Sequence, residues 1–539
     1  MIFIIQWMLI NAVVLALAYP LAQYLSYIFR FEESLFPYQK KIEDKVFDFT
    51  GLYRGPMDWL EYLKSLLKFE FLCLIAIYIH ARIQSFREPF FNPSEAFQFA
   101  ASFITNTNWQ SIPGEQSWGN PLWLMGVIFN NFQSAAVGLC VLVAFARAFF
   151  RKKIEGLGNF WVDLWRSFAF VLLPISFIAA LLLVSQGVPQ NFRTDIEIAQ
   201  YDSSVASSQA VPMGPLAIQG AIKLLGTNGG SYTQANGASP LENPTGFSLF
   251  LGLVLMLLIP SVSCFLFANL LSKKRLGWML WSLMFLMASI FVMTAYHFES
   301  ALMLAKETRF GTEGMVLWNS VMTATATGAT AGILDEFQPL SNGAYLFLMN
   351  LGEIAFGGVG MGIVNLLMVL ILCAFIMNLL TGSSATFLRK KIPLNAIKLA
   401  MFYIIFAPCV ILITLFGFYA FGIIREVSPY AVLAWWHAIS SWVQNNGSAY
   451  YGYLRNDLLM NYLSGLLMLA GRFVPIMMAL AMAGLLKKEG FLETQQEAFT
   501  VDSGLFAVIS LVVIFIITLL AFLPLWSFGA LAGQVLVQG

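Results

Sequence analysis

The sequence contains few charged residues. Only 11% of its 539 residues are Asp, Glu, Lys or Arg, whereas 59% are hydrophobic. A water-soluble fold of this length needs more charge to cover its surface. The 30 basic and 29 acidic residues nearly balance, so no excess of positive charge favours nucleic acid as a partner. These shortages predict a polytopic membrane protein.

Residues that carry enzyme chemistry are also scarce. The five cysteines are scattered without a CxxC pair, and the three histidines are isolated from one another. Inert buried thiols are therefore favoured over a metal or redox site. The sequence has neither the GxxxxGK[ST] phosphate loop nor the DKTG motif of a phosphorylated pump. We expect no catalytic site and no bound nucleotide in this chain.

The basic residues predict the topology. They gather in five clusters, which the positive-inside rule assigns to the cytoplasm: 30–64, 151–166, 273–275, 389–398 and 487–488. Two long apolar runs lie between each neighbouring pair of clusters. With a retained first span and a last one at about 503–526, the chain has ten expected crossings and both termini outside.

This pattern predicts an all-α membrane protein built from four repeated units. The expected parts are an N-terminal helix (1–29), a cytoplasmic surface segment (30–64), four repeats (65–150, 151–272, 273–388 and 389–488) and a C-terminal helix (489–539). The segment 187–211, rich in Ser, Gln and Ala, is expected to be an exterior loop.

Each repeat contains a short helix followed by a polar turn on the outer side. The helix starts are predicted at Asn92-Pro93, Gly214-Pro215, Thr312-Glu313 and Ser428-Pro429. The turns are "TNTNWQ" (105–110), "TNGGSY" (227–232), "TATGAT" (325–330) and "NNGSAY" (445–450). These helices are too short to cross a bilayer, and lipid cannot satisfy a non-helical turn. The four turns are therefore predicted to surround a pore.

The residue types of the turns favour a monovalent cation. Gly, Thr and Asn allow backbone carbonyls to face inward, where they replace the hydration shell of an ion such as potassium. The turns contain no Asp, Glu, Lys or Arg, which argues against a divalent-cation or anion site. The negative dipole ends of the short helices also favour a cation.

Over essentially its whole length the chain resembles the KdpA family, the potassium-binding subunits of bacterial potassium-transporting P-type ATPases. The resemblance is carried by the "TNTNWQ", "TNGG" and "NNGSA" turns and by "GEIAFGGVG" (352–360) and "GRF" (471–473). It implies membership of a superfamily of potassium transporters with four membrane-pore-membrane repeats. It also implies a bacterial inner-membrane location and the partner subunits KdpB, KdpC and KdpF.

The resemblance implies a potassium selectivity filter with Gln110 directly behind it. Its expected members are Asn106, Thr107, Asn108, Thr227, Asn228, Gly229, Ala326, Thr327, Gly328, Asn445, Asn446 and Gly447. The first turn has Asn108 where the others have glycine, and Asn is among the few residues that tolerate a positive φ.

Two ionisable residues lie within apolar runs, Glu353 and Arg472, and are predicted to shape the electrostatics below the filter. The alternative is a structural pair in which the two charges satisfy each other. The segment "GGVGMG" (357–362), which includes Gly357, Gly358 and Gly360, is expected to break the long helix of the third repeat and to gate the exit from the filter. Lys223, in the second short helix, could lie in the outer vestibule, but it is rather expected to snorkel to the surface.

Three other functions remain open from the sequence. A secondary transporter also has broken helices, but it would have two inverted halves, whereas these four units share one orientation. A membrane enzyme would need convergent nucleophiles or ligands. A free-standing potassium channel or cation-coupled potassium transporter of the same superfamily is the nearest alternative.

Overall fold

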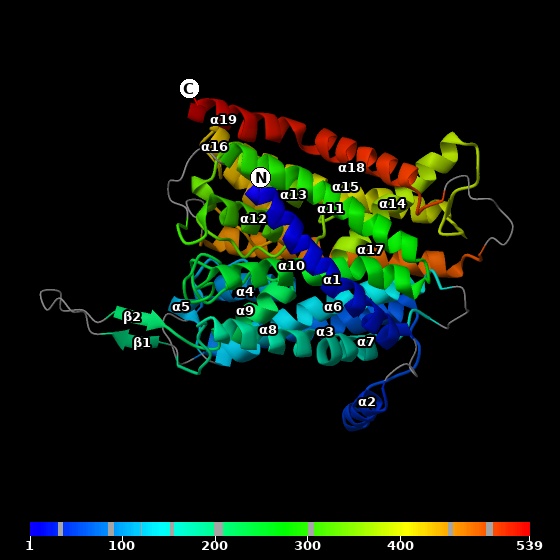
Figure 1. Ribbon diagram of the computed structural model, residues 1–539, viewed down its shortest axis with the longest axis horizontal. Coiled ribbons are helices and arrows are strands. Elements are labelled where there is room, and N and C mark those ends of the chain that lie inside the picture. The colour runs from blue at the N-terminus through cyan, green and yellow to red at the C-terminus, as the bar shows by residue number, and fades with distance from the viewer. Residues whose placement is uncertain are drawn as a thin grey trace, which may run out of the picture.

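The computed structural model describes residues 1–30, 36–84, 91–119, 121–150, 156–193, 195–198, 209–299, 307–450, 456–491 and 500–538. Its long helices lie side by side in one bundle (Figure 1). Two short antiparallel hairpins depart from the all-α expectation. Strands β1 (Asp195–Ile198) and β2 (Gln209–Pro212) pair within the expected exterior loop, and β3 (Thr386–Phe387) pairs with β4 (Lys390–Lys391).

Nine helical segments of the described residues are long and apolar enough to cross a membrane. Six are single helices with no irregular turn, and five of these are α1 (Ile2–Arg30), α10 (Gly246–Leu270), α11 (Lys274–Glu299), α15 (Leu394–Ala420) and α17 (Leu458–Lys488). Three contain a π-helical turn: η2 (Leu122–Ile128) with α6 (Phe129–Arg147); α7 (Phe160–Arg166), η3 (Ser167–Leu172) and α8 (Leu173–Ser185); and α18 (Gly504–Leu525), η6 (Trp526–Leu531) and α19 (Ala532–Gln538). The ninth is α14 (Met361–Leu380).

The tenth expected crossing corresponds to α3 (Trp59–Ile83), which has 25 residues. Asp58 caps its N-terminus in a capping box, so the helix begins before the apolar run predicted from residue 65. Lys64 and Lys68 on this helix are exposed, whereas Glu70 is only 2% exposed. The charges of α3 therefore distinguish it from the nine strongly apolar segments.

Four short helices enter the bundle beside the long ones. They are α4 (Pro93–Ile104), α9 (Leu216–Leu225), α12 (Gly311–Ala324) and α16 (Pro429–Val443), with 12, 10, 14 and 15 residues. At ~1.5 Å per residue, each is shorter than the ~30 Å hydrocarbon core of a bilayer. The predicted caps Asn92 and Ser428 both accept hydrogen bonds from the first helical turn. These half-length helices confirm the repeated unit expected from the sequence.

The second long helix of the third repeat is broken. It consists of α13 (Pro339–Asn350), a non-helical segment (351–360) and α14. The sequence predicted a break at 357–362, but the helix already ends at Asn350 and restarts at Met361. The break begins early because Gly352 and Glu353 already have positive φ angles, of 77° and 58°.

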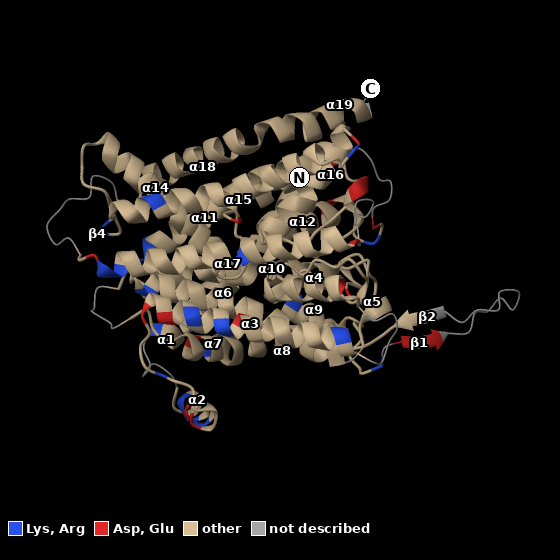
Figure 2. Cartoon of the chain, turned by 180° about the vertical axis from the view of Figure 1, so that it is seen from behind, with Lys and Arg blue, Asp and Glu red and all other residues tan. Residues whose placement is uncertain are grey.

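Lysine and arginine gather toward the end of the bundle that carries α7 and β4, and charged residues are sparse in its middle (Figure 2). Two buried ion pairs stabilise this end. Arg147 contacts Asp163 at 2.6 Å, and Arg166 on α7 contacts Glu43 of α2 (Pro37–Thr50) at 2.8 Å. The second pair attaches the surface helix α2 to the bundle. That this end faces the cytoplasm, and that both termini lie outside, stay predictions.

Two further helical segments of the described residues are very short. They are α5 (Gly114–Ser117) and the single 3-10 turn η4 (Leu334–Glu336).

Candidate functional site

The four short helices end with the same backbone geometry. The residue that starts each turn adopts a left-handed conformation, with φ of 66° at Asn106, 51° at Thr227, 50° at Ala326 and 52° at Asn445. The next amide in each turn donates to the carbonyl five residues earlier, at 3.1, 2.7, 2.8 and 2.9 Å for residues 107, 228, 327 and 446. This is the bonding pattern that ends a helix in a Schellman motif. Four dissimilar sequences thus form equivalent turns.

Two of these left-handed residues are unusual. Thr227 is β-branched, and such residues rarely adopt positive φ; Ala326 has no polar side chain that could compensate locally. A strained conformation of this kind costs on the order of 1–3 kcal/mol and persists only where the surroundings impose it. The strain therefore marks the turns as a candidate functional site.

The turns contact one another in a closed ring. A Cβ atom added to Gly447 would lie 1.9 Å from the Thr107 carbonyl oxygen. One added to Gly328 would lie 2.0 Å from the Asn446 oxygen, and one on Gly229 would lie 2.4 Å from the Thr327 oxygen. The ring closes between the first and second turns, where the Asn106 side chain donates to the Thr227 carbonyl at 2.8 Å.

Side chains behind the ring connect neighbouring turns. Gln110 donates to the Ser231 carbonyl and accepts from the Ser231 amide, both at 2.8 Å, which joins the first turn to the second. Asn445 donates to the Thr107 hydroxyl at 2.8 Å, which joins the fourth turn to the first. Gln110 therefore links the first turn to the second, and its role as support directly behind a potassium filter stays a prediction.

A cavity of about 590 Å³ opens on one side of the ring. The third residue of every turn lines it: Asn108, Gly229, Gly328 and Gly447. Asn108 has a positive φ of 56°, as the sequence predicted for the exchange of glycine by asparagine. Neither atom of its buried side-chain amide has a hydrogen-bond partner among the residues that the structure describes. The amide is thus available to a ligand or solvent in this cavity.

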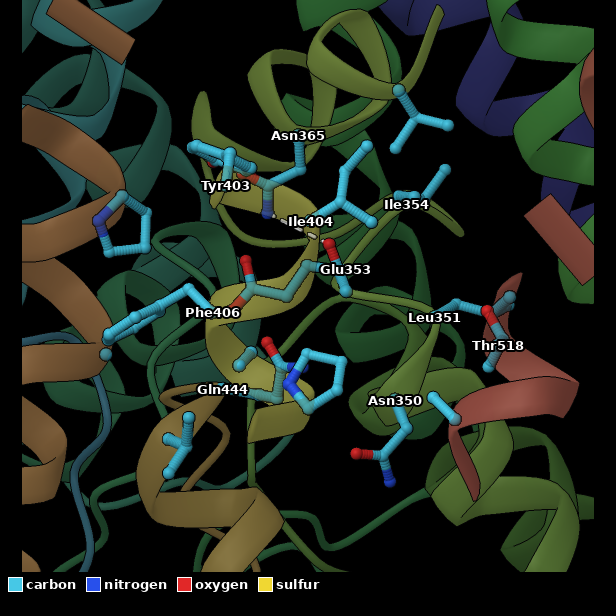
Figure 3. A pocket seen from close by; sticks show the side chains of 18 of the residues that line it. Asn350, Leu351, Glu353, Ile354, Asn365, Tyr403, Ile404, Phe406, Gln444 and Thr518 are labelled. Carbon is cyan, nitrogen blue, oxygen red and sulfur yellow. Dashed lines mark hydrogen bonds between the residues drawn. The ribbon is translucent and has the colours of Figure 1, made fainter. Parts of the chain in front are cut away.

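A second cavity, of about 860 Å³, adjoins the opposite side of the ring and reaches the broken helix. Glu353, Arg472 and Asn445 are among its lining residues, and Figure 3 shows Glu353 amid Asn365, Tyr403 and Gln444. The sequence prediction that both ionisable residues lie below the turns is consistent with this cavity.

The break in the third repeat lies directly against the turns. The Gly357 amide donates to the Ala324 carbonyl at 2.8 Å, and the Val359 amide donates to the Thr227 hydroxyl at 3.0 Å. On its other side the segment touches α6, because a Cβ on Gly360 would lie 2.1 Å from the Gly138 carbonyl oxygen. The segment is therefore held between α6 and the second and third turns.

Arg472 is 7% exposed and donates to the Ser134 carbonyl of α6 at 2.9 Å. It interacts electrostatically with Glu353 and with Glu70 of α3, although neither carboxylate is among the direct ion pairs found within the described ranges. Glu70 is a buried ionisable residue that was not predicted from the sequence. Its position inside an apolar run was the available signal, the same one that identified Glu353.

The prediction for Lys223 was wrong. Its side chain is 3% exposed and lies 2.5 Å from Glu242, so it forms a buried ion pair and does not snorkel. Glu242 comes 19 residues later in the chain, beyond the second turn. The residue pattern of the short helix α9 could not predict this ion pair, because Glu242 lies outside the helix.

A family model described as "KdpA: Potassium-transporting ATPase A subunit" matches residues 8–535. The chain belongs to the KdpA family. It is similar to the potassium-transporting ATPase potassium-binding subunits of Hydrogenobaculum sp. (35% identical, covering 92% of this chain and 91% of the relative) and Pectobacterium atrosepticum (36%, covering 92% of each). The Clostridium perfringens subunit is 34% identical and covers 98% of each chain.

The KdpA-family chain also shares its fold with the potassium transporter TrkH of Vibrio parahaemolyticus. The TM-score is 0.55 at 15% sequence identity, over 78% of this chain and 84% of TrkH. This likeness concerns the fold alone. It agrees with a multi-pass helical membrane protein in which short helices alternate with long ones.

The close contact between the third and fourth turns predicts the effect of Gly328→Ala. The new methyl group would overlap the Asn446 carbonyl oxygen, and alanine would be strained at a φ of 69°. We expect a destabilisation of about 1–3 kcal/mol, measured as a lower midpoint of thermal unfolding by tryptophan fluorescence.

Gly417→Ala is the matched control, because a Cβ at this position on α15 meets no atom within 4 Å. Alanine in a helix interior is expected to be neutral or stabilising by about 0.5–1 kcal/mol. Equal unfolding midpoints for the two variants would contradict the close packing of the ring.

Proposed function

We propose that this chain is the potassium-binding and translocating subunit of an ATP-driven, high-affinity potassium uptake pump. The observation that carries the proposal is the closed ring of four turns, whose contacts are made by backbone carbonyls with glycine at three places and with the Asn106 side chain at the fourth. Rings of carbonyl oxygens replace the hydration shell of potassium. The printed names of the relatives, potassium-binding subunits, support the same ion.

The ring selects the cation by geometry and by helix dipoles. Its proposed ligands come from residues 106–108, 227–229, 326–328 and 445–447, with Gln110 as support behind them. The C-terminal ends of α4, α9, α12 and α16 lead into the turns. Each C-terminus carries a partial negative charge of roughly half an elementary charge, which stabilises a monovalent cation without a carboxylate.

The energy for uptake comes from a partner. The relatives are named as subunits of a potassium-transporting ATPase, and we infer that this chain assembles with a P-type ATPase subunit, KdpB, and with KdpC and KdpF in a bacterial inner membrane. The chain itself binds potassium and no nucleotide. A free-standing channel of the same superfamily would be purified from its native membrane without an ATPase subunit.

Placing a carboxylate in the ring tests the filter. We expect Gly229→Asp and Gly447→Asp each to lower the preference for potassium over sodium by about tenfold or more, because both positions touch a neighbouring carbonyl. The measurement is competition between the two ions for binding to the purified complex, followed by calorimetry.

The control is Gly187→Asp, at a positive-φ position with no atom within 4 Å of the new Cβ. This variant should bind both ions as the wild type does. If the ion preference survives in both ring variants, the filter assignment is wrong.

We further propose that the broken segment of the third repeat gates the exit from the ring. Gly357, Gly358 and Gly360 give this segment the backbone freedom to move. The segment lies next to the ring, because a Cβ added to Gly358 would be 3.7 Å from the Thr227 hydroxyl. Glu353 and Arg472 set the electrostatic potential of the cavity that follows.

Removing the buried charges tests this gate. Arg472→Ala leaves Glu353 and Glu70 without their cation, so we expect tighter ion retention and slower transport; Glu353→Gln should have the opposite effect on ion affinity. Ion affinity and transport by the reconstituted complex are the measurements. Unchanged affinity and transport in both variants would refute a role for these residues in the ion path.

A further inference from the structure

The second turn of the ring differs from the other three. Its third residue, Gly229, does not have a positive φ, whereas Asn108, Gly328 and Gly447 have φ angles of 56°, 69° and 96°. The Gly229 carbonyl also accepts a hydrogen bond at 2.7 Å from the side-chain amide of Asn236. A carbonyl that is held by a protein donor is a weaker ligand for a cation. The ring is therefore asymmetric at this position.

Lys223 determines how Asn236 is oriented. The Lys223 ammonium donates to the Asn236 side-chain oxygen at 2.9 Å. Lysine can only donate hydrogen bonds, so Asn236 must direct its oxygen toward Lys223 and its NH₂ group toward Gly229. Asn236 itself is only 8% exposed, so little solvent competes for the hydrogen bonds of its side-chain amide. The orientation of the amide follows from the charge of the lysine.

Glu242 in turn holds Lys223 in place. Its carboxylate lies 2.5 Å from the Lys223 ammonium, and the two side chains are only 3% and 6% exposed. The same carboxylate accepts from the Thr233 amide at 3.1 Å, from the Thr233 hydroxyl at 2.6 Å and from the Ser231 hydroxyl. A buried carboxylate with this many donors is fixed in position. The network thus connects the short helix α9 to the segment that follows its turn.

We propose that Lys223 and Glu242 are positioning residues that set the ion selectivity of the ring by holding the Gly229 carbonyl through Asn236. This inference rests on the proposed function of the ring. The pair adds no net charge beside the ring, so its effect on the ion is through the direction of one carbonyl. Freeing that carbonyl changes the size of ion that the ring accepts.

The test compares the affinities of the purified complex for potassium, rubidium and sodium, measured by calorimetry. In Lys223→Met and in Asn236→Leu the Gly229 carbonyl loses its oriented donor. We expect both variants to change the ratio of potassium to rubidium affinity by about threefold or more, in the same direction. Lys223→Arg keeps a cation that can only donate, and it should restore the ratio toward that of the wild type.

Glu242→Gln separates orientation from charge. This variant leaves the ammonium uncompensated beside the ring, so the affinities for all three cations should fall together while the ratio changes less than in Lys223→Met. Glu43→Gln is the matched control, because it breaks another buried ion pair, the one with Arg166 at the end of the bundle that carries α7. It should leave the ion affinities and their ratio unchanged.

The inference fails if Lys223→Met and Asn236→Leu keep the wild-type ratio, or if Glu43→Gln changes the ratio as much as they do. Gly229→Asp, measured in the same series, tells this failure from that of the proposed function. If Gly229→Asp lowers the preference for potassium over sodium and Lys223→Met has no effect on either ratio, only the positioning role is wrong. If Gly229→Asp is also without effect, the ring is not the filter.

Discussion

The structure depends on one constraint: a non-helical backbone inside a membrane must have its polar groups satisfied by protein or by an ion, because lipid offers no hydrogen bonds. Four helices stop part-way through the bundle, at residues 104, 225, 324 and 443. Each helix is followed by a residue in the left-handed conformation, and the next backbone amide donates to the carbonyl five residues earlier. Gly229, Gly328 and Gly447 then each lie against a carbonyl of the neighbouring turn.

The need for close contact explains which residues form the ring. Gly229, Gly328 and Gly447 lie so near a neighbouring carbonyl that no side chain fits. At the fourth equivalent position the chain has Asn108, whose positive φ is tolerable for asparagine. Its amide lines the cavity beside the ring and has no hydrogen-bond partner among the described residues. The ring is therefore a pseudo-fourfold structure with a different chemical environment at each turn, unlike one built from four identical chains.

Local pattern was sufficient to predict the long helices, the four half-helices with the caps Asn92 and Ser428, and the position of the turns, since these depend on residues close in sequence. Features that depend on distant residues were missed. Lys223 was assigned to the surface because its partner Glu242 follows the turn. Glu70 lies in an apolar run as Glu353 does, but its interaction with Arg472 joins α3 to α17 and could not be predicted from that run. The early end of α13 depends on Glu353 at positive φ, which the glycine pattern alone did not indicate.

The most direct test of the account is the position of the ion itself in a high-resolution density map of the complex, recorded once in potassium and once in sodium. The account predicts density on the axis of the ring, within about 3 Å of the carbonyl oxygens of all four turns, in potassium and its loss or displacement in sodium. A ring without ion density in potassium, with the ion held elsewhere in the chain, would contradict it.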